Sequence, residues 1–172
     1  LNDLLDLSLL ESGKMNYNFQ SGNLVEVIQQ VANELRNVAS ERSLSFEVIY
    51  DPNVPVESFV GVFDSSRIGQ VVRNLVSNAI KFSDQGTVIR ITANPSSSGK
   101  MGFIVSNRGI GILESELDSI FDKFSQSSKT QTGAGGKGMG LAICKEIIEQ
   151  HEGRIWAKSD PSGQTEFFVE LP

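Results

Sequence analysis

Apolar residues recur every three or four positions in two long segments, which is the spacing of an amphipathic helix. The first segment begins after Asn23, a favourable N-cap with Glu26 three residues later. Its apolar stripe consists of Leu24, Ile28, Val31, Leu35 and Val38. The second segment begins at Asp64, and its buried face consists of Ile68, Val71, Val72, Leu75, Ala79 and Ile80. Both segments are therefore predicted to be helices that cover a core, and residues 139–150 predict another.

The run of leucines at residues 1–10 also predicts a helix, which ends at Gly13. Leucines cover much of its circumference, so this helix would expose apolar surface if it stood alone. We expect it to pack on something outside this chain. Residues 13–22 are predicted to be a polar connector.

Alternating apolar and polar residues predict strands at 44–50, 87–93, 103–106, 154–158 and 166–170. Pro52 and Pro55 indicate a loop, and residues 95–99 a turn. This order of elements predicts an α+β fold, a two-layer sandwich with a mixed, mostly antiparallel sheet covered on one face by helices. Residues 109–140 are too long and polar for an ordinary connector, contain a short helical piece at 114–121, and are expected to lie over the helices as a functional loop.

Charge and composition exclude several classes of protein. The net charge of −6 offers no basic excess for non-specific nucleic-acid binding. Neither an apolar run long enough to cross a membrane nor a signal peptide is recognisable, so we expect a cytoplasmic domain, whether or not a longer parent protein is anchored in a membrane. The single cysteine, Cys144, cannot form an intrachain disulfide and is expected to be a buried apolar residue on a helix.

Two glycine clusters suggest contact with a ligand. Residues 107–112 follow a strand, and residues 133–140 precede a helix. A glycine-rich run that ends at a helix N-terminus presents free N–H groups to phosphate, although a merely flexible loop has the same composition. The second cluster is not a P-loop, because Lys137 is followed by Gly138. It is not a dinucleotide-binding turn either, because no strand immediately precedes it.

The second long helix carries Asn74, Asn78 and Lys81 on one side, since they are four and three residues apart. Asparagine is a poor helix former, so two of them one turn apart suggest a function. An amide oxygen can bind Mg²⁺ and a lysine can bind phosphate. A solvated polar face is the alternative interpretation.

Together these segments resemble the histidine-kinase branch of the ATPase superfamily that includes DNA gyrase, heat-shock chaperones and mismatch-repair ATPases. Residues 74–83 resemble its N box, 107–112 its first glycine box, 121–124 its F box and 136–141 its second glycine box. The tail from His151 to Pro172 also matches the family's ending. Residues 1–15 resemble the C-terminal end of the dimerisation and histidine-phosphotransfer hairpin, which makes 16–172 the catalytic ATP-binding domain.

The resemblance implies the Bergerat ATP-binding fold, with ATP or ADP and Mg²⁺ as ligands. Asn78 would bind Mg²⁺, Asn74 would assist, and Lys81 would contact phosphate. The first box would line the adenine pocket, the second would wrap the triphosphate, and Phe121 and Phe124 would anchor the lid between them. The implied ligand-binding residues, besides Asn78 and Lys81, are Asn107, Gly109, Ile110, Gly111, Phe124, Gly136, Lys137, Gly138, Met139, Gly140 and Leu141.

The implied reaction is transfer of the γ-phosphoryl group of ATP to a histidine on an upstream helix that this chain lacks, followed by relay to a response-regulator aspartate. The partners would be the upstream hairpin and the receiver domain of that regulator, with no nucleic acid. The parent protein would be a homodimer and this chain a monomer that does not autophosphorylate alone. Hydrolytic members of the superfamily carry a glutamate base at the position of Asn74, so transfer is favoured over hydrolysis.

The sequence departs from the family in a few places. The first glycine box opens with Asn107, where the family has an aspartate that accepts a hydrogen bond from adenine. Asn107 implies either a natural weak binder or an engineered, nucleotide-binding-impaired protein, and it is the only support for the alternative function, a degenerate pseudokinase that regulates a partner. Glu152 and Gln164 replace common glycines and are expected in tolerant turns. His151 is the only histidine, and we interpret it as structural.

Overall fold

The structure, a computed structural model, describes residues 2–123 and 139–172. Its helices are α1 (Asn2–Glu11), α2 (Leu24–Glu41), α3 (Ser65–Phe82) and α4 (Gly140–Gln150), with short 3-10 turns η1 (Val56–Phe59), η2 (Glu114–Glu116) and η3 (Ser119–Phe121). Its strands are β1 (Gln20–Asn23), β2 (Ser45–Ile49), β3 (Val60–Phe63), β4 (Val88–Ser97), β5 (Lys100–Arg108), β6 (Arg154–Ser159) and β7 (Gln164–Leu171).

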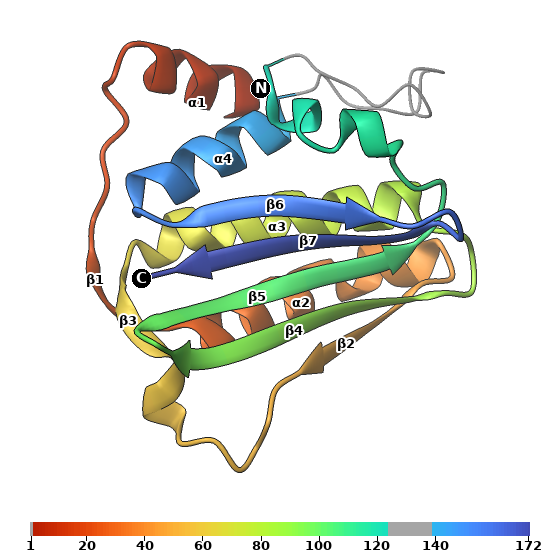
Figure 1. Cartoon of the computed structure of the whole chain (residues 1–172), viewed down its shortest axis with the longest axis horizontal. Coiled ribbons are helices and arrows are strands. Elements are labelled where there is room, and N and C mark those ends of the chain that lie inside the picture. The colour runs from red at the N-terminus through yellow and green to blue at the C-terminus, as the bar shows by residue number, and fades with distance from the viewer. Residues whose placement is uncertain (1, 124–138) are drawn as a thin grey trace.

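The main sheet has the strand order β2-β4-β5-β7-β6. Strand β2 runs parallel to β4, and the other neighbours are antiparallel. Helices α2, α3 and α4 lie on one face of this sheet (Figure 1). Between the two layers the apolar faces of helices and strands form one core, to which Cys144 also belongs as expected. The predicted α+β sandwich is therefore confirmed.

The helix starts predicted from the sequence are confirmed because each has a local cap. The side chain of Asn23 accepts a hydrogen bond from the Glu26 N–H (3.2 Å), and that of Asp64 accepts one from the Arg67 N–H (3.0 Å). Each bond satisfies a backbone donor that the first helical turn leaves open.

A second, two-stranded sheet was missed. β1 pairs antiparallel with β3, from Gln20 opposite Phe63 to Asn23 opposite Val60. The sequence predicted a connector and a loop there, because the segment 20–23 is polar and its pairing partner lies some forty residues away. β4 and β5 are also longer than predicted. β4 extends to Ser97, into the expected turn at 95–99, with an irregular register, and the turn is confined to Ser98 and Gly99, both with positive φ.

Helix α1 corrects another expectation, since it packs on α4 of the same chain rather than only on something outside it. Leu7 is buried within the core, whereas Leu4 and Leu5 are more than half exposed. An ion pair joins Asp6 to Arg67 on α3 (3.6 Å). In residues 2–123 and 139–172, no helix combines the length and the apolar character needed to cross a membrane.

Candidate nucleotide-binding site

Helix α3 brings the N box against the start of α4. Asn74 and Asn78 are half-buried and Lys81 is exposed. The Asn74 Nδ2 donates a hydrogen bond to the carbonyl oxygen of Gly140, the first residue of α4 (3.3 Å). A Cβ atom on Gly140 would lie 3.8 Å from the Asn74 amide group. Two segments predicted to hold phosphate and metal, 66 residues apart in the chain, are therefore in contact.

The first glycine box packs on the C-terminal end of α3. The Asp84 N–H donates to the Arg108 carbonyl (2.9 Å), and the Ile110 N–H donates to the Phe82 carbonyl (3.4 Å). A Cβ on Gly109 would lie 1.8 Å from the Phe82 carbonyl oxygen. The structure thus explains why residue 109 is glycine, which the sequence did not reveal. The backbones at Gly109 and Phe82 lie too close together for a side chain at residue 109.

Gly163 supports the same junction from the β6–β7 turn, and the sequence analysis missed it. Its carbonyl accepts a hydrogen bond from the Gly109 N–H (3.0 Å), and a Cβ on Gly163 would lie 2.1 Å from the Gly109 carbonyl oxygen. Its φ of +90° also favours glycine. The sequence analysis assigned no role to residues 161–163. Within the first box itself, Gly111 has a φ of +70° and Ile110 is exposed.

Asn107 points into the molecule. It lies on β5 opposite Thr165 of β7, and it shares the helix-covered side of the sheet with Phe103 and Val105, two positions apart along the strand. Its side chain is only 7% exposed. In the described part of the chain, its amide forms no hydrogen bond with another side chain or the backbone. Because it has no partner among the described residues, this amide can hydrogen-bond a ligand.

The N-terminus of α4 differs from those of α2 and α3, because within residues 2–123 and 139–172 no side chain caps it. Met139, at the N-cap position, is buried, Gly140 has no side chain, and Leu141 packs on the core. Among the described residues, no side chain occupies the first N–H groups of α4, and its positive dipole end is suited to an anion. The remaining predicted ligand residues of the lid and second box, Phe124, Gly136, Lys137 and Gly138, lie outside the described residues.

Two contacts hold the described beginning of the segment that the sequence predicts to be the lid. Phe121 is buried on η3, where its ring meets Phe167 of β7 edge to face, with 6.2 Å between the ring centroids. Lys123 pairs with Glu11 of α1 (3.2 Å).

His151 has a structural role, as the sequence analysis expected. It lies buried at the C-terminal end of α4. Its Nε2 accepts a hydrogen bond from the Asp64 backbone N–H (3.0 Å), and its Nδ1 donates to the Ile147 carbonyl (2.7 Å). Both ring nitrogens are therefore occupied when the imidazole is neutral. Glu152 lies in the expected turn with a φ of +58°, whereas the expectation of a turn at Gln164 is wrong, because this residue begins β7.

Comparison with known proteins agrees with this geometry. A family profile described as histidine kinase-, DNA gyrase B- and HSP90-like ATPase matches residues 63–172. Hybrid signal transduction histidine kinase D of Dictyostelium discoideum is 34% identical over 100% of this chain and 11% of its own length. The sensor protein kinase WalK of Staphylococcus aureus is 35% identical over 100% of this chain and 40% of its own length. The chain thus spans well under half of these relatives.

Solved structures of histidine kinases are also similar to this chain. The catalytic domain of histidine kinase ThkA is 32% identical, with a TM-score of 0.73, and covers 90% of this chain and 95% of its own. ThkA in complex with the response regulator TrrA superposes with a TM-score of 0.77 at 27% identity, over 98% of this chain and 46% of that one. Full-length ShkA in complex with AMPPNP shares the fold, with a TM-score of 0.85 at 24% identity, over 99% of this chain and 34% of that one.

The chain belongs to the histidine kinase-, DNA gyrase B- and HSP90-like ATPase family. Within it, the sequence and the fold are those of a histidine-kinase ATP-binding catalytic domain.

Proposed function

We propose that this domain binds ATP with Mg²⁺ and transfers the γ-phosphoryl group to a histidine imidazole, for relay to an aspartate of a response regulator. The observation that carries the proposal is the convergence on α3: Asn74 contacts the uncapped start of α4, and the first glycine box packs on the end of the same helix.

Adenine would lie against Asn107, whose buried amide can accept a hydrogen bond from the exocyclic amino group of the base. Gly109, Ile110 and Gly111 would line the same pocket. The phosphates would extend toward the N-terminus of α4, where Met139, Gly140 and Leu141 supply backbone N–H groups and the helix dipole. Gly136, Lys137, Gly138 and Phe124 would complete this part of the site.

Asn78 would supply an amide oxygen to Mg²⁺, with Asn74 beside it and Lys81 reaching a phosphate oxygen. Asn74 uses its Nδ2 as a donor to Gly140, which leaves its Oδ1 for a ligand. Mg²⁺ would neutralise the phosphate charge, the chemistry that phosphoryl transfer requires.

Transfer is favoured over hydrolysis because the amide of Asn74 cannot accept a proton from water. In transfer, the imidazole nitrogen forms the new bond to phosphorus while the bond to the β,γ-bridging oxygen breaks, and ADP leaves with that electron pair. The proposed acceptor is outside this chain, since both nitrogens of His151 are held by the backbone.

In this proposal residues 1–15 are the end of a dimerisation and phosphotransfer hairpin and 16–172 are the catalytic domain. The chain would be a monomer and the parent a homodimer. The regulator is a proposed partner by analogy with ThkA, which forms a complex with the response regulator TrrA. The degenerate-module alternative is not supported by the comparisons, whose relatives are named as kinases.

The test is incubation with γ-labelled ATP and Mg²⁺, with and without a separately supplied histidine-containing hairpin. We expect no label on the chain alone and slow, acid-labile labelling of the hairpin, because a weak encounter replaces a tethered one. A hairpin with its acceptor histidine replaced by alanine is the matched control. Acid-labile label on His151, or hydrolysis of ATP without labelling of the hairpin, would contradict the proposal.

A further inference from the structure

The face of the main sheet turned away from the helices carries a row of large apolar side chains. Ile104, Phe168 and Trp156 lie side by side on β5, β7 and β6. The strand residues on either side of Ile104 and Phe168 are buried toward the helices, so these side chains point outward. The open face of an antiparallel sheet is ordinarily polar, and a row of apolar residues there is a departure that needs a reason.

The rings of this row are held in a fixed arrangement. Trp156 and Phe168 stack with their planes 4° apart and their centroids separated by 5.2 Å. Each ring also lies under a cation, since the Arg154 guanidinium is 4.4 Å from the Trp156 centroid and the Lys158 ammonium is 5.2 Å from that of Phe168. Such ordered rings provide apolar contact area without a further loss of side-chain freedom.

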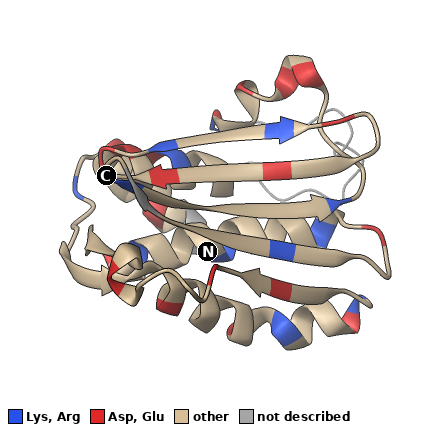
Figure 2. Cartoon of the chain, turned by 60° about the horizontal axis from the view of Figure 1, so that its bottom comes forward, with Lys and Arg blue, Asp and Glu red and all other residues tan. Residues whose placement is uncertain are grey.

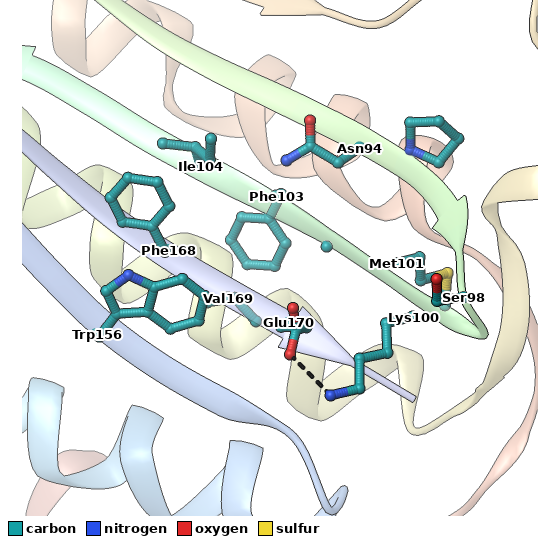
Figure 3. A pocket seen from close by; sticks show the side chains of 12 residues that line it. Asn94, Ser98, Lys100, Met101, Phe103, Ile104, Trp156, Phe168, Val169 and Glu170 are labelled. Atoms are coloured by element: carbon teal, nitrogen blue, oxygen red, sulfur yellow. Dashed lines mark hydrogen bonds and ion pairs between the residues drawn. The ribbon is translucent and has the colours of Figure 1, made fainter.

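A hollow of about 490 Å³ adjoins the row. Trp156 and Phe168 lie on one side of it and Asn94 on the other (Figure 3). Gly102 contributes no side chain to it, and a Cβ there would lie 2.1 Å from the Val169 carbonyl oxygen. We call the hollow and the three apolar side chains beside it the aromatic groove.

The charge around the aromatic groove is basic. Glu170 pairs with Lys100 (3.3 Å), and, in the described part of the chain, neither Arg154 nor Lys158 forms an ion pair, although Glu170 and Glu166 are their cross-strand neighbours. Figure 2 colours the charged residues of the chain, and the strand registers place more basic than acidic residues on the outer face of the sheet. The basic residues are Arg90, Lys100, Arg108, Arg154 and Lys158, and the acidic ones are Glu47, Glu166 and Glu170. A chain with a net charge of −6 thus presents a locally positive face.

We propose that the aromatic groove docks an acidic peptide segment of a partner protein. An apolar side chain of that segment enters the hollow beside Phe168 and Trp156, and flanking carboxylates pair with Arg154 and Lys158. Apolar burial supplies affinity, and complementary charge selects the partner and its orientation. The groove lies across the sheet from the proposed nucleotide site, so the proposal does not depend on the catalytic function.

The probe is a displayed library of random 12-residue peptides, selected on the whole chain, with the enriched peptides then synthesised. Trp156 is the only tryptophan, so its fluorescence reports contact with the groove directly. We expect enriched peptides to combine carboxylates with a large apolar residue and to change this fluorescence. Arg154→Glu/Lys158→Glu should weaken binding at least ten-fold without altering ADP affinity.

The matched control is Lys14→Glu/Lys145→Glu, which makes the same change of charge at two exposed positions outside the sheet. It should bind the enriched peptides within about two-fold of the unmodified chain. The proposal is overturned if the Arg154/Lys158 variant binds them as well as the unmodified chain, if the peptides lack carboxylates, or if no peptide is enriched. Binding of anionic lipid vesicles with no peptide enrichment would overturn it in favour of a membrane surface.

Discussion

The two ends of helix α4 differ in whether the polar groups there have hydrogen-bond partners. At the C-terminal end, His151 is buried and both ring nitrogens are engaged by backbone groups. At the other end, no side chain within residues 2–123 and 139–172 caps the N-terminus of α4. In the first glycine box, which packs on α3, Asn107 is buried, and its amide has no partner within the same residues. His151 and Asn107 are both buried polar residues. The presence or absence of a hydrogen-bond partner in the protein is what distinguishes the structural residue from the candidate ligand-binding residue.

The C-terminal end of α4, which we call the closed end, involves more residues than His151. The Asp64 carboxylate caps α3 and also accepts a hydrogen bond from the Asn18 N–H (2.8 Å), so one residue joins the connector, α3 and α4. The rings of Tyr17 and Phe19 pack on the imidazole. This end holds three segments of the chain together, and changes there should alter stability rather than ligand binding.

The largest expected effect is at the closed end. His151→Ala removes two hydrogen bonds and leaves the Asp64 N–H buried without a partner. We expect unfolding free energy to fall by about 2–4 kcal/mol, measured by urea denaturation. ADP affinity at a temperature where the variant is folded should be unchanged. A variant that keeps its stability but loses ADP would place His151 in the nucleotide site.

The N-terminus of α4 and the neighbouring residues of α3 form what we call the open end. There, Asn78→Ala should abolish the Mg²⁺-dependent part of nucleotide affinity. This part is about 1–3 kcal/mol, the range for a hydrogen bond or ligand at a charged group. Stability should fall by less than about 0.5 kcal/mol, because the side chain is half-exposed. Calorimetry with and without Mg²⁺ measures the first effect, and denaturation the second. A large loss of stability would instead show that Asn78 is a structural residue.

The smallest expected effect concerns the Tyr17 hydroxyl. Unlike the other polar groups described at the closed end, it is buried without a hydrogen-bond partner in the described chain. Burial raises the pKa of Tyr17 above 10.0, with the Glu146 carboxylate adding to the shift. The unfolded chain releases this proton first, so stability falls as the pH rises above about 10. Tyr17→Phe should gain up to about 1 kcal/mol at neutral pH and lose less stability between pH 9 and 11. Equal alkaline profiles would mean that this hydroxyl is solvated.

Much of the fold was predictable because its signals are local. Asn23 and Asp64 start their helices through bonds to residues three positions away, and the stripes of α2 and α3 follow from helical spacing. The pairing of β1 with β3 was not predictable, since the four residues of β1 are polar and their partner is distant in the sequence. The docking of α1 on α4 was missed because the two helices are distant in the sequence.

The site was predictable as a set of segments but not as an arrangement. The sequence placed Asn74 and Gly140 in separate boxes, and only the structure shows the hydrogen bond between them. The glycines of the first box looked alike in the sequence, yet Gly109 is required by the close approach of Phe82. The row of Ile104, Phe168 and Trp156 depends on strand register, which spacing along one strand cannot give.

The central claim, that the open end of α4 and the first glycine box bind a nucleotide, is tested most directly at Asn107. Asn107→Asp replaces a neutral acceptor by a charged one that, in the proposed site, would face the adenine amino group. Calorimetric titration should show ATP and ADP bound more tightly by about 1–3 kcal/mol, roughly ten- to hundred-fold, and GTP not at all, because its base presents a carbonyl oxygen there. The ligand-free variant should be less stable, since the new carboxylate is buried without a partner. Equal ADP affinity of the two proteins, or a gain confined to ATP, would contradict the placement of Asn107 at the base.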